Sequence, residues 1–420
     1  MSLASSFTNF MKIIFFISLI LIVYTYFIYP ILIYLLSQLY KKPVRGKYIY
    51  PALSIIISAY NEERNIENKL KSLLEIDYPR ERFEILIGSD GSIDKTDEIV
   101  KRFTAEKKGQ SPLADKPIAM AGTVPVFPAE KKRIKFFRQE TRQGKPNMLN
   151  LLAKEAKGEI LVFTDARQRL DRDALKELVK HFSDEKVGSV SSALFYENEN
   201  GNNKTGVGIG MYWKYEKFIR KSESRMGSML GATGALYAIR KELFPQLPND
   251  LLLDDVYIPM KIVERGYRAI FDKKAKVYDK VFANPKEEFL RRVRTLAGNY
   301  QLFFYLGSLF NPLKGKISWQ FFSHKFLRLM VPFLLIALLV SNVMVIKIGT
   351  VPFGDSPYFY WIFLLLQIIF YVFALLGVLL KNKNKAFDIP RMFCLMNSAA
   401  VVGLYRLLTR RQDVLWYKVV

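Results

Sequence analysis

An aspartate at position 165 is the residue whose place in the sequence points most directly to chemistry. It follows the apolar run 158–164, which predicts a buried parallel strand that carries Asp165 at its carboxyl end. Open α/β sheets bind ligands at that edge, and a carboxylate there can hold a divalent cation, because hard cations prefer oxygen ligands. Arg167 stands where the second aspartate of a metal-binding Asp-x-Asp is expected.

Further acidic groups follow the same logic. Ser89 and Asp90 follow the predicted strand 83–88, so we expect the Asp90 carboxylate in the same crevice as Asp165. Asp254 and Asp255 open a predicted helix that runs through Glu264. One of this pair would cap the helix and leave the other free to act as a general base, although a plain helix cap explains the pair as well.

Basic residues occupy two places suited to phosphate. Arg142 and Lys145 flank a glycine at a predicted helix start, where they would meet a phosphate or form a solvated turn. Arg291 and Arg294 share one face of a predicted helix from Pro285 and would bind phosphate oxygens or lipid headgroups. The segment 58–62 ends a strand, so its amides would bind a base or anion, or Asn61 would cap the next helix.

Alternating strand-length apolar runs and amphipathic stretches position these residues. The predicted strands are 53–58, 83–88, 134–138 and 159–164, and the predicted helices are 62–75, 94–103 and 145–157. Residues 105–132 show no period and are predicted to form a surface loop. The pattern predicts βαβ units, and therefore an α/β fold with a parallel sheet.

The chain of 420 residues is strongly basic, with 63 Lys and Arg against 39 Asp and Glu and a net charge of +24. Such an excess suits nucleic acid, anionic lipid or phosphorylated substrates. The basic residues are spread out without an interleaved aromatic binding module, so we do not expect nucleic acid as a partner. A single cysteine, Cys394, excludes an internal disulfide framework.

Long apolar stretches indicate an integral, multi-pass membrane protein in contact with membrane lipids. They cover residues 11–40, 326–346, 359–380 and, more weakly, 389–408. Four basic residues directly follow the first stretch and place the next segment in the cytoplasm; they are Lys41, Lys42, Arg45 and Lys47. Lys381, Lys383 and Lys385 give the same indication after the third stretch.

The fourth apolar stretch conflicts with this orientation. A full crossing by 389–408 would turn Arg410 and Arg411 outward, so we expect this segment to dip into the membrane or lie in its interface. We therefore predict four regions: an anchor (1–47), a cytoplasmic domain (48–300), an interfacial segment (301–325) and a membrane region (326–420).

Seven motifs, in this order, resemble those of membrane-bound family-2 glycosyltransferases, relatives of cellulose, chitin, hyaluronan and poly-N-acetylglucosamine synthases. They are ISAYNEE, SDGSIDKT, RQGKPNMLN, VFTDARQ, GATGALYAIRKELF, LLLDDV and RRVRTLAGNYQ, and they cover about residues 50–300. The resemblance implies a GT-A fold, a nucleotide-sugar donor, inversion at the anomeric carbon and a glycosyltransferase activity.

The resemblance also implies roles for single residues. Asp255 matches the catalytic aspartate, and Asp165 the first aspartate of the metal motif for Mg²⁺ or Mn²⁺. The residues implied for the donor are Ala59, Tyr60, Glu62, Asp90, Lys145 and Arg294. Those implied for the acceptor pocket are Gly231, Ala232, Thr233, Gly234 and Asp254, with Ala235 at its border. Arg167 and Arg291 are further candidates for the diphosphate.

Three departures from the family pattern bear on the mechanism. Arg167 weakens the metal site or supplies a cation from the protein. Arg291 and Thr295 replace a glutamine and a tryptophan that are typical of polymerising members, and Ser89 replaces the first of two adjacent aspartates.

We therefore expect transfer from a nucleotide sugar, with a UDP-sugar as first choice, to a membrane-associated saccharide in cell-surface polysaccharide synthesis, with accessory export subunits as further partners. One alternative is the addition of a single sugar to a lipid-linked acceptor. Another is a catalytically inactive membrane scaffold.

Overall fold

The computed structural model describes residues 3–44, 46–105, 133–197, 207–280, 285–348, 357–380 and 384–415. Nearly all of the predicted loop 105–132 lies outside the described residues, as do Arg45, Lys381 and Lys383. The chain divides into two compact units, which are taken in turn. The sheet unit comprises Tyr40–Lys204, Arg220–Val281 and Asp413–Val420, and the helical unit comprises Met1–Leu39, Thr205–Ile219 and Phe282–Gln412.

These units divide the chain differently from the four predicted regions. Residues 205–219 and 282–300, which fall in the predicted domain 48–300, group with the helical unit. Residues 40–47 and 413–420 group instead with the sheet unit.

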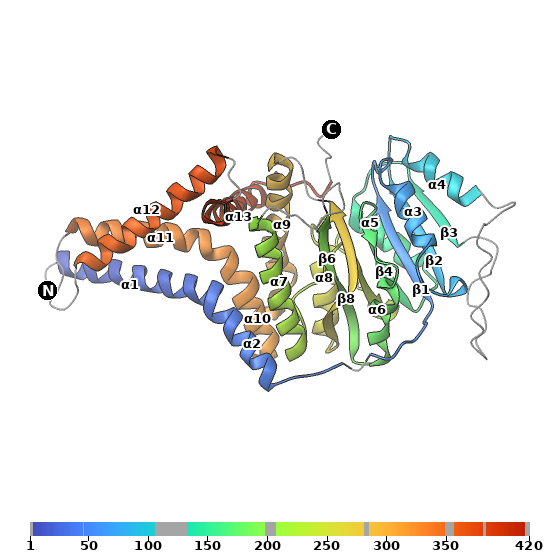
Figure 1. Cartoon of the computed structure of the whole chain (residues 1–420), viewed down its shortest axis with the longest axis horizontal. Helices are drawn as coiled ribbons and strands as arrows, with labels where there is room; N and C mark the ends of the chain where they lie inside the picture. The colour runs from blue at the N-terminus through green and yellow to red at the C-terminus, as the bar shows by residue number, and fades with distance from the viewer. Residues whose placement is uncertain are drawn as a thin grey trace. The chain divides into compact units, whose positions relative to one another are not determined.

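The described strands of the sheet unit form one sheet in the order β3-β2-β1-β4-β7-β6-β8-β5. Figure 1 shows the sheet with helices packed against it. The parallel half consists of β1 (Leu53–Ala59), β2 (Phe83–Asp90), β3 (Ile134–Gln139) and β4 (Ile160–Phe163). The mixed half consists of β5 (Arg169–Leu170), β6 (Val187–Glu197), β7 (Tyr237–Arg240) and β8 (Arg268–Lys280), with β7 antiparallel to β4. The sheet confirms the predicted α/β class.

The helices between the strands are α3 (Ile66–Leu74), α4 (Thr96–Ala105), α5 (Lys145–Glu155), α6 (Ala174–Val179) and α8 (Asp254–Glu264). Of these, α4, α5 and α8 begin at or close to the predicted positions, α3 begins later than predicted, and α6 was not predicted. The prediction that Asn61 caps the first of these helices is wrong, because Asn61 has a φ of 53° and its side chain accepts from the Ile93 N–H instead. The predicted capping of α8 by an aspartate is also wrong, since its N-cap is Leu253, without a side-chain bond.

Glu84 on β2 joins several elements of the parallel half. Its carboxylate is buried and accepts from the Ser54 hydroxyl (2.7 Å) and the Lys157 N–H (2.6 Å). Its other oxygen pairs with the Lys135 ammonium at 2.7 Å. The Gly158 N–H in turn donates to the Ser54 hydroxyl at 2.8 Å. The buried carboxylate therefore connects β1, β2 and β3 with the segment that leads into β4, and both of its oxygens are hydrogen-bonded.

The helical unit contains apolar helices of membrane-spanning length. Among the described residues four stretches are long and apolar enough to cross a bilayer: Ser6–Leu39, Lys316–Ile348, Tyr358–Leu379 and Lys385–Leu408. The first joins α1 (Leu3–Val23) to α2 (Tyr29–Leu39) through the π-helical turn Tyr24–Ile28, and the second ends in α11 (Leu327–Ile348). The others are α12 (Pro357–Leu379) and α13 (Lys385–Leu408), while α9 (Pro285–Tyr305) is amphipathic.

Packing inside the helical unit is largely aromatic. Phe15 of α1 is buried against Leu338 of α11 and Tyr360 of α12. Glu216, from α7 (Val207–Met226), is buried and accepts from Arg328 at 2.9 Å. Buried charges are costly unless they are paired, and this pair meets that requirement.

The Glu84 contacts generate a stability prediction. Glu84→Ala removes the acceptor of a lysine and of two buried donors, so the free energy of unfolding should fall by roughly 3 kcal/mol. For a unit of this size that loss lowers the thermal midpoint by roughly 6–12 °C, measured by thermal unfolding in detergent.

Glu67→Ala is the matched control. Glu67 pairs with Lys71 at 2.8 Å, but its side chain is 40% exposed. Exposed pairs contribute about 1 kcal/mol or less, so the midpoint should stay within about 3 °C. Equal effects of the two substitutions would contradict a joining role for Glu84.

Candidate active site

A lysine between two aspartates is the central feature of the sheet edge. Lys145 is the first residue of α5, and its ammonium lies 3.1 Å from Asp165 Oδ1 and 3.2 Å from Asp254 Oδ1. Burial alone would lower the pKa of Lys145, but the charges of Asp165, Asp254 and Asp255 outweigh it and raise that pKa. The structure thus brings together four of the predicted site residues, from α5, the end of β4 and the start of α8.

Asp90 holds the turn before Lys145 through two hydrogen bonds. The Gln143 N–H donates to Asp90 Oδ1 at 2.7 Å, and the Gly144 N–H donates to Asp90 Oδ2 at 2.8 Å. Asp90 is buried, so these charge-assisted bonds are well shielded from water. In this arrangement the Asp90 carboxylate supports the turn that carries Lys145.

The predicted nucleoside-binding residues lie at the end of β1 and just after it. Ala59 is the last residue of β1, and the guanidinium of Arg142 stacks over the ring of Tyr60 at 3.7 Å from its centroid. The Glu62 N–H donates to the Thr96 hydroxyl at 2.7 Å, and its carboxylate accepts from Asn65.

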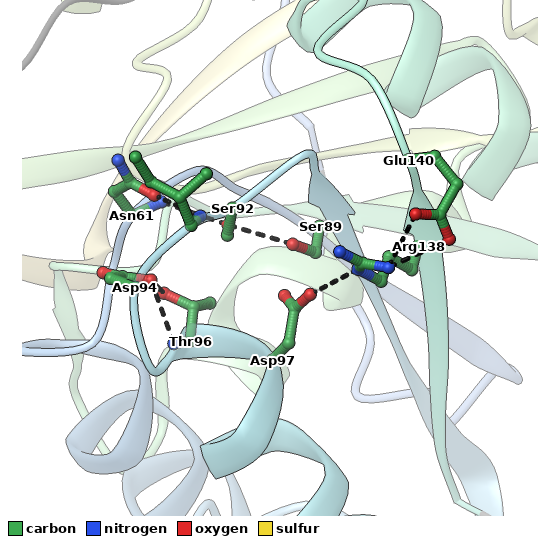
Figure 2. A network of polar contacts seen from close by, with 9 residues as sticks. Asn61, Ser89, Ser92, Asp94, Thr96, Asp97, Arg138 and Glu140 are labelled. Carbon is green, nitrogen blue, oxygen red and sulfur yellow. Dashed lines mark hydrogen bonds and ion pairs between the residues drawn. The ribbon is translucent and has the colours of Figure 1, made fainter.

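Hydrogen bonds tie this turn to the one after β2 (Figure 2). The Asn61 N–H donates to the Ser92 hydroxyl, and Ser92 bonds Ser89 at 2.9 Å. Asp94 accepts from the Thr96 N–H, as a capping residue of α4 would. The two turns therefore form one connected rim at the carboxyl ends of β1 and β2.

Asp255 is set against the predicted acceptor turn. Its carboxylate accepts from the Gly234 N–H at 3.0 Å, and its carbonyl accepts from the Ala232 N–H at 2.7 Å. Burial, with the neighbouring charge of Asp254, raises the pKa of Asp255 to about 6, against the opposing charges of Lys145 and Arg220. A carboxylate with such a pKa is poised to accept a proton near neutral pH.

Two cations that the sequence analysis did not single out also lie here. Arg220, on α7, donates to the Thr233 hydroxyl at 2.9 Å and acts on Asp255 through its charge. Lys69 is buried on α3 and donates to the Thr164 hydroxyl (2.6 Å) and the Gln168 carbonyl (2.9 Å), next to Asp165. Burial lowers the pKa of Lys69 to about 7. Both looked like ordinary basic residues of an amphipathic helix.

Arg167 pairs with an aspartate of the mixed half of the sheet. Its guanidinium donates to the buried carboxylate of Asp279 on β8 at 2.7 Å, and Gln168 donates to the same oxygen at 3.1 Å. This pairing gives Arg167 a structural partner from the mixed half of the sheet.

The donor set bears on the predicted Mg²⁺ or Mn²⁺. Within the described residues no group of three or more His, Cys, Asp or Glu side chains is arranged to hold a metal ion. Asp165 is the one carboxylate of the motif; it is 40% exposed and pairs with Lys145. These residues fit a cation held by one carboxylate and substrate phosphates, as Mg²⁺ sites commonly are, and do not fit one held by protein ligands alone.

Two predicted site residues belong to the other unit. Arg291 and Arg294 lie on α9, in the helical unit, where the Thr295 hydroxyl donates to the Arg291 carbonyl. Their approach to the diphosphate stays a prediction.

The chain matches known protein families over most of its length. Residues 54–247 match glycosyl transferase family 2, and residues 160–374, more than half of the chain, match glycosyl transferase family group 2. A solved mannosyltransferase of Pyrobaculum calidifontis, in complex with GDP-Man and Mn²⁺, is similar with a TM-score of 0.67 at 23% identity. That similarity covers 95% of this chain and 99% of that one.

Curated relatives include poly-beta-1,6-N-acetyl-D-glucosamine synthases. The enzyme of Staphylococcus aureus (strain COL) is 24% identical over 288 residues, which cover 66% of this chain and 61% of that protein. The enzyme of Staphylococcus epidermidis is 24% identical over 259 residues, which cover 60% and 55%. The match therefore spans about 61% of the first relative's length.

These matches, together with the sheet and its acidic edge, confirm the predicted fold and family. The chain belongs to the family-2 glycosyltransferases and is a membrane glycosyltransferase with a GT-A fold.

Proposed function

We propose that this enzyme transfers a sugar, with inversion, from a nucleotide sugar to a membrane-associated saccharide acceptor. The observation that carries the proposal is the ammonium of Lys145 between Asp165 and Asp254, beside Asp255. A cation held by carboxylates suits a diphosphate leaving group, and a carboxylate with a raised pKa suits a general base. Polysaccharide synthesis is supported by the staphylococcal synthases, which are named for an N-acetylglucosamine polymer, and a UDP-sugar stays our first choice of donor.

The reaction is a single displacement in which Asp255 accepts the proton of an acceptor hydroxyl. The hydroxyl oxygen forms a bond to the anomeric carbon while the bond from that carbon to the diphosphate oxygen breaks. The leaving nucleoside diphosphate gains negative charge, and the ammonium of Lys145 stabilises that charge. Preorganised charge of this kind is often the largest catalytic contribution of an enzyme.

The donor would bind at the rim of the parallel half of the sheet. Ala59, Tyr60 and Glu62 would hold the nucleoside at the end of β1, and Asp90 would act by fixing the turn that presents Lys145. Asp165 would hold Mg²⁺ or Mn²⁺ together with the donor phosphates, and such an ion would neutralise diphosphate charge. The Mn²⁺ and GDP-Man of the Pyrobaculum structure support a metal-dependent nucleotide-sugar site.

The acceptor would lie over residues 231–235, where Gly234 and Thr233 face Asp255 and Arg220. Addition of a single sugar to a lipid-linked acceptor is the second candidate function. It is favoured by Arg291 and Thr295, which replace residues typical of polymerising relatives.

We place the sheet unit in the cytoplasm. Lys41, Lys42 and Lys47 follow the first apolar stretch and belong to this unit, as the positive-inside rule requires of a cytoplasmic segment. The predicted regions 1–47, 48–300, 301–325 and 326–420 remain our proposal for how the chain divides between membrane and cytoplasm.

A panel of nucleotide sugars tests the function. Purified protein in nanodiscs should release nucleoside diphosphate from one donor class, and Asp255→Asn should lower kcat by roughly 10²–10⁴-fold while it leaves donor binding intact. Because the base must be ionised, kcat/KM should fall about tenfold per pH unit below about pH 6.

Arg220→Met supplies a second readout in the same assay. Removal of a positive charge that opposes the raised pKa of Asp255 should move the acid limb to higher pH, whereas Arg220→Lys should leave it in place. Full activity of Asp255→Asn with every donor would remove the base assignment.

A glycine substitution tests how Asp255 is positioned. A β-carbon on Gly234 would lie 2.9 Å from Asp255 Oδ2, so Gly234→Ala should displace the carboxylate and lower kcat by roughly 10–100-fold with little change in donor KM. Initial rates at varied donor concentration measure both constants.

Gly227→Ala is the matched control, because a β-carbon there meets nothing within 4 Å. It should leave kcat within about twofold. A normal kcat for Gly234→Ala would show that the turn does not position Asp255.

A further inference from the structure

The chain returns to the sheet unit after its last membrane helix. The residues through Gln412 belong to the helical unit, but Asp413–Val420 belong to the sheet unit. The Leu415 N–H donates to Asp413 Oδ1 at 2.9 Å, which gives the described part of this segment a local turn. This segment was not among the predicted site residues.

Two apolar side chains of the segment lie against the turn that carries Lys145. A β-carbon placed on Gly144 would lie 3.3 Å from Val414 Cγ1 and 3.8 Å from Leu415 Cδ2. Gly144 has a φ of 94°, a conformation that suits glycine, and the missing side chain leaves room for this contact.

The turn is therefore held on two sides. Asp90 accepts both backbone N–H groups of Gln143 and Gly144, and Val414 and Leu415 pack where a side chain of Gly144 would stand. The next residue, Lys145, places its ammonium between Asp165 and Asp254. A change in the packing of the turn would shift this ammonium, whose distances to both carboxylates are short.

We propose that Val414 and Leu415 are positioning residues of the donor site, which hold the turn 142–145 so that Lys145 meets the donor diphosphate. This role rests on the proposed function. Because Val414 and Leu415 are only partly buried, they pack on the turn without enclosing it.

The same return has a consequence for the membrane topology. Tyr40 and Asp413 both belong to the sheet unit. Because we place that unit on one side of the membrane, we expect an even number of crossings between Val281 and Asp413. The stretches ending in α11 and α12 are more apolar than α13, and we take them as the two crossings. We therefore infer that α13, the least apolar of the four stretches, does not cross. It carries the buried Asp388, paired with Arg391, near its start.

The test is the double variant Val414→Ser with Leu415→Ser in nanodiscs. Donor KM and the Kd for the matching nucleoside diphosphate should each rise roughly tenfold, because Lys145 is displaced from the diphosphate, and kcat should fall as well, because the same ammonium meets the charge of the leaving group. The conservative pair Val414→Ile with Leu415→Met keeps the apolar contact and should restore both constants.

A lowered thermal midpoint with unchanged donor KM and unchanged nucleoside diphosphate affinity would show a merely structural segment and overturn the proposal. The affinity readout needs no turnover, so it separates this failure from failure of the proposed function. In the latter case the unaltered protein would bind no nucleoside diphosphate and turn over no nucleotide sugar.

Cysteine labelling tests the topology. With Cys394→Ser as background, Lys47→Cys and Arg411→Cys each place a single thiol at an exposed position, one before and one after the three later apolar stretches in the sequence. A membrane-impermeant maleimide should label both from the same side. Labelling from opposite sides would show that α13 crosses and would overturn the return of the chain.

Discussion

The pairing of Lys145 with Asp165 and Asp254 is the interaction on which the site depends. These residues come from α5, the end of β4 and the start of α8, and without the ammonium the two carboxylates would repel each other in a partly buried place. The same cation would then meet the negative charge of a diphosphate. Both roles require Lys145 to be held in place. Asp90 does this, because each oxygen of its carboxylate accepts a hydrogen bond from a backbone N–H of the preceding turn.

Positive side chains offset part of the negative charge at the acidic edge of the sheet. Burial and Asp254 raise the pKa of Asp255 to about 6, whereas Lys145 and Arg220 oppose that rise. The base therefore stays ionised near neutral pH and still binds a proton readily. Arg220 also bonds Thr233 on the acceptor turn, so one residue contributes both to the charge balance and to the geometry around Asp255.

Much of the parallel half could be predicted from the sequence, because continuous apolar runs such as those of β1 and β2 are buried and the acidic residues come at their ends. The charge partners could not. Arg167 pairs with Asp279, which lies in the mixed half of the sheet, and Lys69 is buried although it looks like a surface lysine of α3. Such pairs depend on which distant segments the fold brings together. The start of α3 was misjudged because Asn61 adopts a positive φ, which the pattern did not indicate.

The most direct test of the account is the affinity for nucleoside diphosphates, measured by titration calorimetry in nanodiscs for the unaltered protein and for Lys145→Met. If Lys145 meets the diphosphate, the substitution should weaken binding of the preferred nucleoside diphosphate by roughly 10–100-fold and leave binding of the bare nucleoside nearly unchanged. Equal affinities of the two proteins for the diphosphate would contradict the role of this lysine and, with it, the proposed site.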